Sequence, residues 1–176
     1  LFLDNDLNGL EEYFDNETIK EYCETHLFEG KKNQILSVPP SYSKSHNLTF
    51  LVGLGENKVD NNFYDIGTLI GSKIKSDAEI IFLNFENEKS LIIDGILYAQ
   101  YKFNNYKSED DSSVNNITFK DIDSSINEIK KDSVFWVRDL INTPALDKSP
   151  EEFINKVKKL VDSSTIDVEV YDKKWL

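Results

Sequence analysis

Segments typical of β-strands alternate with segments typical of α-helices between residues 34 and 122, and this order limits the folds open to the chain. The strand-like stretches are residues 34–38, 48–55, 78–85 and 115–122. The stretches with apolar residues at helical spacing are residues 61–74 and 88–103. Such an order produces βαβ units. We therefore predict an α/β fold, a mixed sheet flanked by helices, for residues 1–122.

Individual segments of this region carry more specific expectations. The run Ala78–Phe85 is almost continuously apolar, which suits a strand covered on both faces. Two further helices are predicted over Asp6–Phe14 and Glu17–Leu27, and Cys23 falls on the apolar face of the second as a small core residue. The helix expected over Glu88–Phe103 has an apolar face made of Ile92, Ile93, Ile96, Leu97 and Tyr101.

A long helix is predicted from Ser124 to Asn142. It must end there, because Thr143 precedes Pro144 and the residue before a proline is disfavoured in the α region. Its apolar stripe consists of Ile126, Ile129, Trp136, Val137, Leu140 and Ile141.

The next helix has clear start signals in "SPEE". Ser149 suits the N-cap, Pro150 the first helical position and Glu152 a capping box. Its expected buried face is Phe153, Val157, Leu160 and Val161, and the alternating stretch Thr165–Asp172 predicts a half-buried strand. The predicted domains are an N-terminal domain at 1–122, a linker helix at 123–142 and the truncated beginning of a second domain at 143–176.

Composition limits the partners of the chain. The 176 residues include 32 acidic and 20 basic side chains, for a net charge of −12, which argues against binding to nucleic acid or an anionic membrane. Hydrophobic residues make up 39%, enough for a core, yet no run approaches the roughly 18 apolar residues of a membrane span. Cys23 has no partner for an internal disulfide, so a reducing cytoplasm is expected. Because the sequence begins with Leu1, we expect it to be a piece of a longer protein.

Gly53 and Gly55 leave two interpretations open. Glycines after a strand let backbone N–H groups approach an anion, so this pair could cradle a phosphate. The dinucleotide fingerprint needs a third glycine at position 58, where the chain has Lys58. The alternative is a tight turn at the end of a strand, which the partial motif favours.

No complete set of catalytic or metal-binding residues is visible. Cys23 and His26 could share a metal at i, i+3, but one cysteine and two histidines, His26 and His46, are too few for the usual zinc site. No G-x-S-x-G elbow offers a serine nucleophile. Arg138 and Asp139 are adjacent on a predicted helix and point in different directions. We therefore assign no catalytic, cofactor-binding or metal-binding residue.

The stretch "VRDLINTPALDKSPEEF", Val137 to Phe153, resembles the domain junction of the leucyl (cytosol) aminopeptidase family. "LVGLG" at Leu51–Gly55 and "ILYAQYKFNNYKS" at Ile96–Ser108 are also similar to family segments, whereas Ala145–Asp147 departs from the family pattern. The junction residues that match are Arg138, Asp139, Leu140, Asn142, Pro144, Ser149, Pro150, Glu151 and Phe153.

This resemblance implies a two-domain hydrolase of which the chain is the first part. The family's N-terminal α/β domain is similar to macro domains, and a linker helix joins it to a catalytic domain that removes N-terminal residues from peptides. That domain binds two divalent metals, such as zinc or manganese, and the subunits usually form hexamers. The family's metal motifs, G-K-G-x-x-F-D-[ST]-G-G and N-T-D-A-E-G-R-L, do not occur in this sequence. We therefore expect the chain to be inactive alone, with the missing catalytic domain and further copies as its partners.

Two other roles are considered. The chain could be a stand-alone macro-like module that binds a nucleotide or ADP-ribose through the loop at Gly53, although the missing third glycine and the acidic surface count against it. It could also have a structural role, in shaping access to the active site and stabilising the oligomer.

Overall fold

The computed structural model describes residues 2–3, 9–44, 48–55, 62–83, 88–106, 115–162, 164–171 and 174–175. The chain divides into two compact units, Leu1–Val134 and Phe135–Leu176, so the boundary falls inside helix α5 (Ser125–Asn142). The domain limits 1–122, 123–142 and 143–176 stay predictions. Within the described ranges, no helix combines the length and apolar character needed to cross a membrane.

The first sheet of unit 1 is three-stranded and mixed. Its order is β1 (Phe2–Leu3), β3 (Thr49–Gly53), β2 (Ile35–Val38). β1 runs parallel to β3, whereas β2 pairs antiparallel with it, from Ile35 opposite Val52 to Val38 opposite Thr49. Both predicted strands at 34–38 and 48–55 are therefore confirmed, with shorter bounds.

Two N-terminal helices form a small core with this sheet. They are α1 (Leu10–Tyr13) and α2 (Asn16–Thr25), and Asp15 caps α2 by accepting the Thr18 backbone N–H at 3.2 Å. The predicted start of the first helix, at Asp6, lies outside the described residues. After β2 the chain forms a 3₁₀ turn, η1 (Pro40–Tyr42). The core residues of this region are Leu10, Phe14, Ile19, Cys23, Phe28, Val38 and Leu51.

The second sheet contains the predicted βαβ unit. β4 (Ala78–Ile80) pairs parallel with β5 (Ile117–Phe119), and α4 (Lys89–Tyr98) lies between them in sequence. The expected mixed α/β class is thus confirmed, with the strands divided between two small sheets. The expectation that Ala78–Phe85 is covered on both faces is wrong in its described part: the paired strand ends at Ile80, and Ile81 is exposed.

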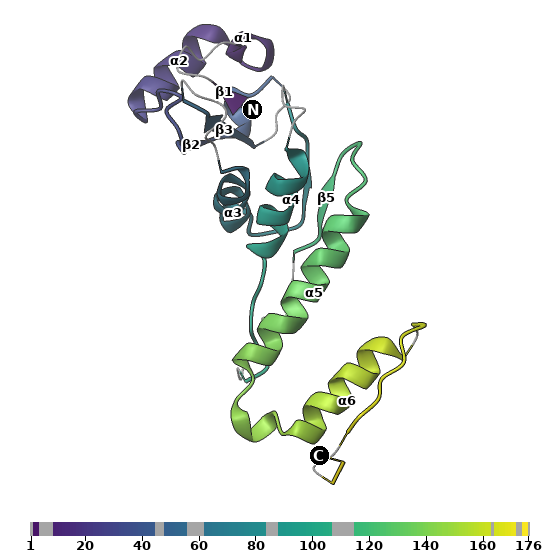
Figure 1. Cartoon of the computed structure of the whole chain (residues 1–176). Coiled ribbons are helices and arrows are strands. Elements are labelled where there is room, and N and C mark those ends of the chain that lie inside the picture. Colours follow the sequence, from purple (N-terminus) through teal and green to yellow (C-terminus); the bar gives the residue numbers. More distant parts are fainter. Residues whose placement is uncertain are drawn as a thin grey trace. The chain divides into compact units, whose positions relative to one another are not determined.

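Helices α3 (Phe63–Lys73) and α4 pack side by side (Figure 1). Glycines make this approach close, because a Cβ on Gly71 would lie 2.6 Å from the Ile96 carbonyl oxygen and one on Gly95 would lie 2.8 Å from the Thr68 backbone nitrogen. Ile92, Ile93, Ile96 and Leu97 of α4 are buried as predicted, whereas Tyr101 lies beyond the end of the helix and is only partly buried. The core here consists of Val52, Leu54, Ile66, Ile70, Ile92, Ile93, Ile96, Leu97, Ile117 and Phe119.

The end of α5 and the start of the next helix follow the sequence signals. The last helical residue is Asn142, and the Thr143 hydroxyl and backbone N–H both donate to the Asp139 carbonyl oxygen, at 2.7 and 2.9 Å. A 3₁₀ turn, η3 (Ala145–Asp147), leads to α6 (Pro150–Val161). Ser149 is the N-cap, and its Oγ accepts the Glu152 backbone N–H at 3.2 Å.

On α5, Ile126 and Ile129 of the apolar stripe are each 63% exposed. Two predictions for the C-terminal third are wrong. No described residue of α6 is buried, and Phe153 is 44% exposed. The predicted strand Thr165–Asp172 does not form in its described residues, because a strand needs a neighbour for its hydrogen bonds and none pairs with it there.

Candidate functional site

In the glycine loop after β3, the backbone N–H groups of Gly53 and Gly55 form hydrogen bonds within the chain itself. The Gly53 N–H donates to the Gln34 carbonyl oxygen at 2.9 Å, and the Gly55 N–H donates to the Gly30 carbonyl oxygen at 2.9 Å. A Cβ on Gly53 would lie 2.6 Å from the carbonyl carbon of Gly30, and Gly55 has a φ of 68°, a conformation that favours glycine. The two glycines therefore let the end of β3 approach the loop at Gly30. Their N–H groups are already donated, which favours the tight turn over the phosphate cradle; Lys58 lies outside the described residues.

Cys23 and His26 do not form a joint metal site. Cys23 is 1% exposed, and burial, followed by the neighbouring Glu24 carboxylate, raises the pKa of its thiol to about 11. His26 is exposed, stacks on the Tyr22 ring at 4.1 Å between centroids, and its Nδ1 lies 2.9 Å from the Tyr22 carbonyl oxygen. A thiol that is both buried and protonated is a poor metal ligand. His46 lies outside the described residues.

The described part of the chain contains no set of side chains that could bind a metal ion. No three His, Cys, Asp or Glu side chains among those residues lie close enough together to hold a metal ion. The two divalent metals implied by the resemblance therefore do not fit the described residues, and no chemical step through them is derived.

The junction residues singled out in the sequence build a helix end. Asp139 supplies the backbone carbonyl that Thr143 caps, and the Lys148 Nζ donates to the Leu140 carbonyl oxygen at 2.7 Å. A lysine at the C-terminal carbonyls also complements the helix dipole. At this junction, Thr143 and Lys148 cap the end of α5 and Ser149 caps the start of α6.

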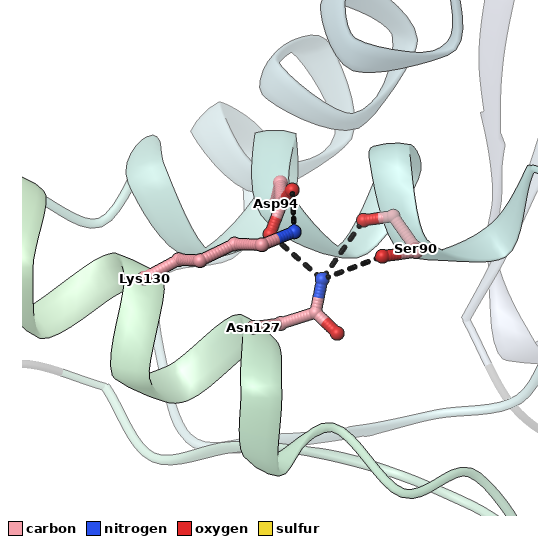
Figure 2. Close-up of polar contacts among 4 residues, drawn as sticks. All are labelled: Ser90, Asp94, Asn127 and Lys130. Atoms are coloured by element: carbon pink, nitrogen blue, oxygen red, sulfur yellow. Dashed lines mark hydrogen bonds and ion pairs between the residues drawn. The ribbon is translucent and has the colours of Figure 1, made fainter.

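A polar cluster that contains two buried side chains joins α4 and α5, and no sequence pattern had indicated it. Asp94 and Asn127 are only 7% and 4% exposed. The Asn127 Nδ2 donates to Asp94 Oδ1 at 2.7 Å and also contacts the carbonyl oxygen and Oγ of Ser90, at 3.0 and 3.1 Å (Figure 2). Lys130 Nζ pairs with Asp94 Oδ2 at 3.1 Å. The sequence feature that could have indicated this cluster is the carboxylate of Asp94, which lies inside the apolar run of α4.

A second polar cluster holds the end of α3 to the chain before β5. The buried Gln100 donates through Nε2 to the Gly71 carbonyl oxygen at 2.8 Å, and its Oε1 accepts from Asn115 Nδ2 at 3.0 Å. The Asn116 backbone N–H donates to Asp77 Oδ1 at 2.7 Å, beside the paired strands. Each polar atom named in this cluster is hydrogen-bonded within the chain. The cluster therefore stabilises the βαβ unit, and none of these atoms is a reactive group.

Comparison with known proteins identifies the fold. Residues 1–110 match the pattern of the cytosol aminopeptidase family, N-terminal domain. The chain belongs to this family. It is similar to the probable cytosol aminopeptidases of Clostridium tetani, 26% identical over 85% of this chain and 35% of the relative, and of Rickettsia bellii, 28% identical over 97% and 39%. The resemblance noted in the sequence is thereby confirmed.

Solved structures of the family share this architecture. The cytosol aminopeptidase of Coxiella burnetii has a TM-score of 0.66 and 22% identity over 92% of this chain and 34% of its own. A tomato leucine aminopeptidase mutant has a TM-score of 0.66 and 17% identity over 84% and 33%. The chain thus spans little more than a third of the length of the relatives it matches, and the likeness to these structures concerns the fold.

Proposed function

We propose that this chain is the N-terminal, non-catalytic part of a cytoplasmic leucyl aminopeptidase, a two-metal exopeptidase that removes N-terminal residues from peptides. The observation that carries the proposal is the match of residues 1–110 to the family's N-terminal domain. Zinc or manganese would bind in a catalytic domain outside this chain.

Activity of the chain and of its full-length parent tests this proposal. Each is incubated with a leucine anilide and manganese at equal subunit concentration, and release of the aniline is followed. We expect turnover by the parent and none by the 176-residue chain, because the family's two metal motifs do not occur in this sequence. Clear turnover by the chain alone, or a parent that hydrolyses no amino-terminal anilide or peptide, would contradict the proposal.

The role within the parent is proposed to be assembly and access to the active site. The match of residues 1–110 to the family's N-terminal domain supports a role within a longer enzyme. Deleting residues 1–122 from the parent should lower the number of subunits in the assembly, obtained from its light-scattering mass divided by the mass of the shortened subunit, and change KM more for long peptides than for a leucine anilide. A hexamer with unchanged KM for both substrates would exclude both roles.

A further inference from the structure

Both hydrophobic cores of unit 1 form without α5. Their buried members come from α1 to α4 and from β2, β3 and β5, together with loop residues near them. None of the described residues of α5 belongs to either core or to the partly buried side chains packed on them. The apolar residues Ile126 and Ile129, in the part of α5 within unit 1, are exposed instead. Membership of the hydrophobic cores therefore does not explain the contact of this helix with α4.

The contacts that do join the two helices are polar and specific. Asn127 donates to Asp94 and to both oxygens of Ser90, and Lys130 donates to Asp94 (Figure 2). Ser90 and Asp94 lie one turn apart on α4, as Asn127 and Lys130 do on α5, so the four side chains meet in one register. Sliding α5 by one turn would separate the Asn127 amide from both acceptors.

We propose that Ser90, Asp94, Asn127 and Lys130 form a polar latch that fixes α5 on α4 in one register and releases without unfolding the cores of unit 1. Buried polar and ionic contacts specify geometry while adding little net stability, because the desolvation of the charged group offsets much of the attraction. The latch concerns residues within unit 1 and does not depend on the proposed function.

Hydrogen exchange in the intact 176-residue chain tests the latch. Asn127→Ala removes the amide from α5 and leaves α3 and α4 unaltered, so it should fold. Losing a hydrogen bond to a charged acceptor should speed exchange of the amides of residues 128–134 roughly tenfold, because a detached helix of this length is only marginally stable in water. Exchange of the α3 and α4 amides should remain at the wild-type rate.

Three comparison variants sharpen the experiment. Asp94→Ala should reproduce the effect of Asn127→Ala, whereas Asp94→Asn keeps an acceptor for Asn127, loses the Lys130 ion pair and should have a smaller effect. Ile129→Ala, on the same helix but outside the latch, should not speed exchange. The proposal is overturned if Asn127→Ala speeds amide exchange equally in α3, α4 and α5, because the three helices would then unfold as one cooperative unit. It is also overturned if residues 128–134 keep their wild-type rate.

Discussion

Burial decides the chemistry of Cys23 and His26, which lie three residues apart near one end of α2. Cys23 faces the core and its thiol pKa rises to about 11, whereas His26 lies at the surface and stacks on Tyr22. A helix places residues three apart on neighbouring parts of its surface, but here only one of the two positions faces the core. Local spacing therefore suggested a shared ligand pair that tertiary packing separates.

Reaction of Cys23 with a disulfide reagent should report its burial. At pH 8 a thiol of pKa about 11 is about 0.1% thiolate, against roughly a tenth for a cysteine of the ordinary pKa 9.0, so native protein should react about a hundredfold more slowly than protein in guanidinium. Absorbance of the released thiol measures both rates, with Cys23→Ser as the blank. Equal rates in the two solvents would show that the side chain is accessible.

The same thiol makes stability depend on alkaline pH. Its folded pKa is raised to about 11 from an ordinary value of 9.0, so the folded state holds the proton over a range in which the unfolded state has lost it. Its contribution is complete below pH 9 and is lost as pH rises towards 11. Urea unfolding between pH 8 and 11 should show a steeper fall in the free energy of unfolding for the wild type than for Cys23→Ser.

Local sequence signals predicted the helices more accurately than they predicted which residues are buried. The predicted helices at 61–74, 88–103 and 124–142 all exist, because their spacing, caps and breakers are encoded within a few residues. The same periodicity gave a wrong buried face for α6, since an apolar stripe does not say what covers it. The Asp94–Asn127 contact joins residues 33 apart, and no local pattern specifies such a pairing.

Substitutions at Asp15, the N-cap of α2, test whether a local capping signal contributes to stability. Asp15 accepts from the Thr18 hydroxyl and backbone N–H, and these bonds, the hydroxyl's first, hold the pKa of its carboxyl below the usual range. Asp15→Ala should lower the thermal midpoint, followed by circular dichroism, whereas Asp15→Asn should retain most of it. The difference between wild type and Asp15→Asn should shrink as pH falls through the folded pKa, below 3.8, because protonation removes the charged acceptor.

A substitution at Gly95 tests whether α3 and α4 are in close contact. Alanine is the better helix former by up to about 1 kcal/mol, so an exposed glycine would gain stability on substitution. At Gly95 the added Cβ would overlap the Tyr64 carbonyl oxygen, and backbone can move only if the helices separate. We expect Gly95→Ala to lower the free energy of unfolding by about 1–3 kcal/mol in urea, with Lys73→Ala at the exposed end of α3 as the neutral control. A stabilised Gly95→Ala protein would show that the helices are not in close contact.

Among the described residues, the buried apolar side chains form the two cores of unit 1, whereas several apolar side chains of α5 and α6 are exposed. The first group includes Ile92, fully buried, and the second includes Ile129, Phe153 and Leu160. Relatives of the chain are almost three times as long. A net charge of −12 favours solubility of the chain despite these exposed residues.

One pair of substitutions separates the two groups of apolar side chains. Ile92→Ala should destabilise the chain by about 2–5 kcal/mol, because it removes buried methyl groups and leaves a cavity. Ile129→Ala makes the same chemical change at a 63% exposed position and should alter the free energy of unfolding by less than about 0.5 kcal/mol. Urea unfolding followed by circular dichroism gives both values. If Ile129→Ala costs as much as Ile92→Ala in the isolated chain, then α5 contributes to a core within this chain, and the division into a folded core and an uncovered helix face is wrong.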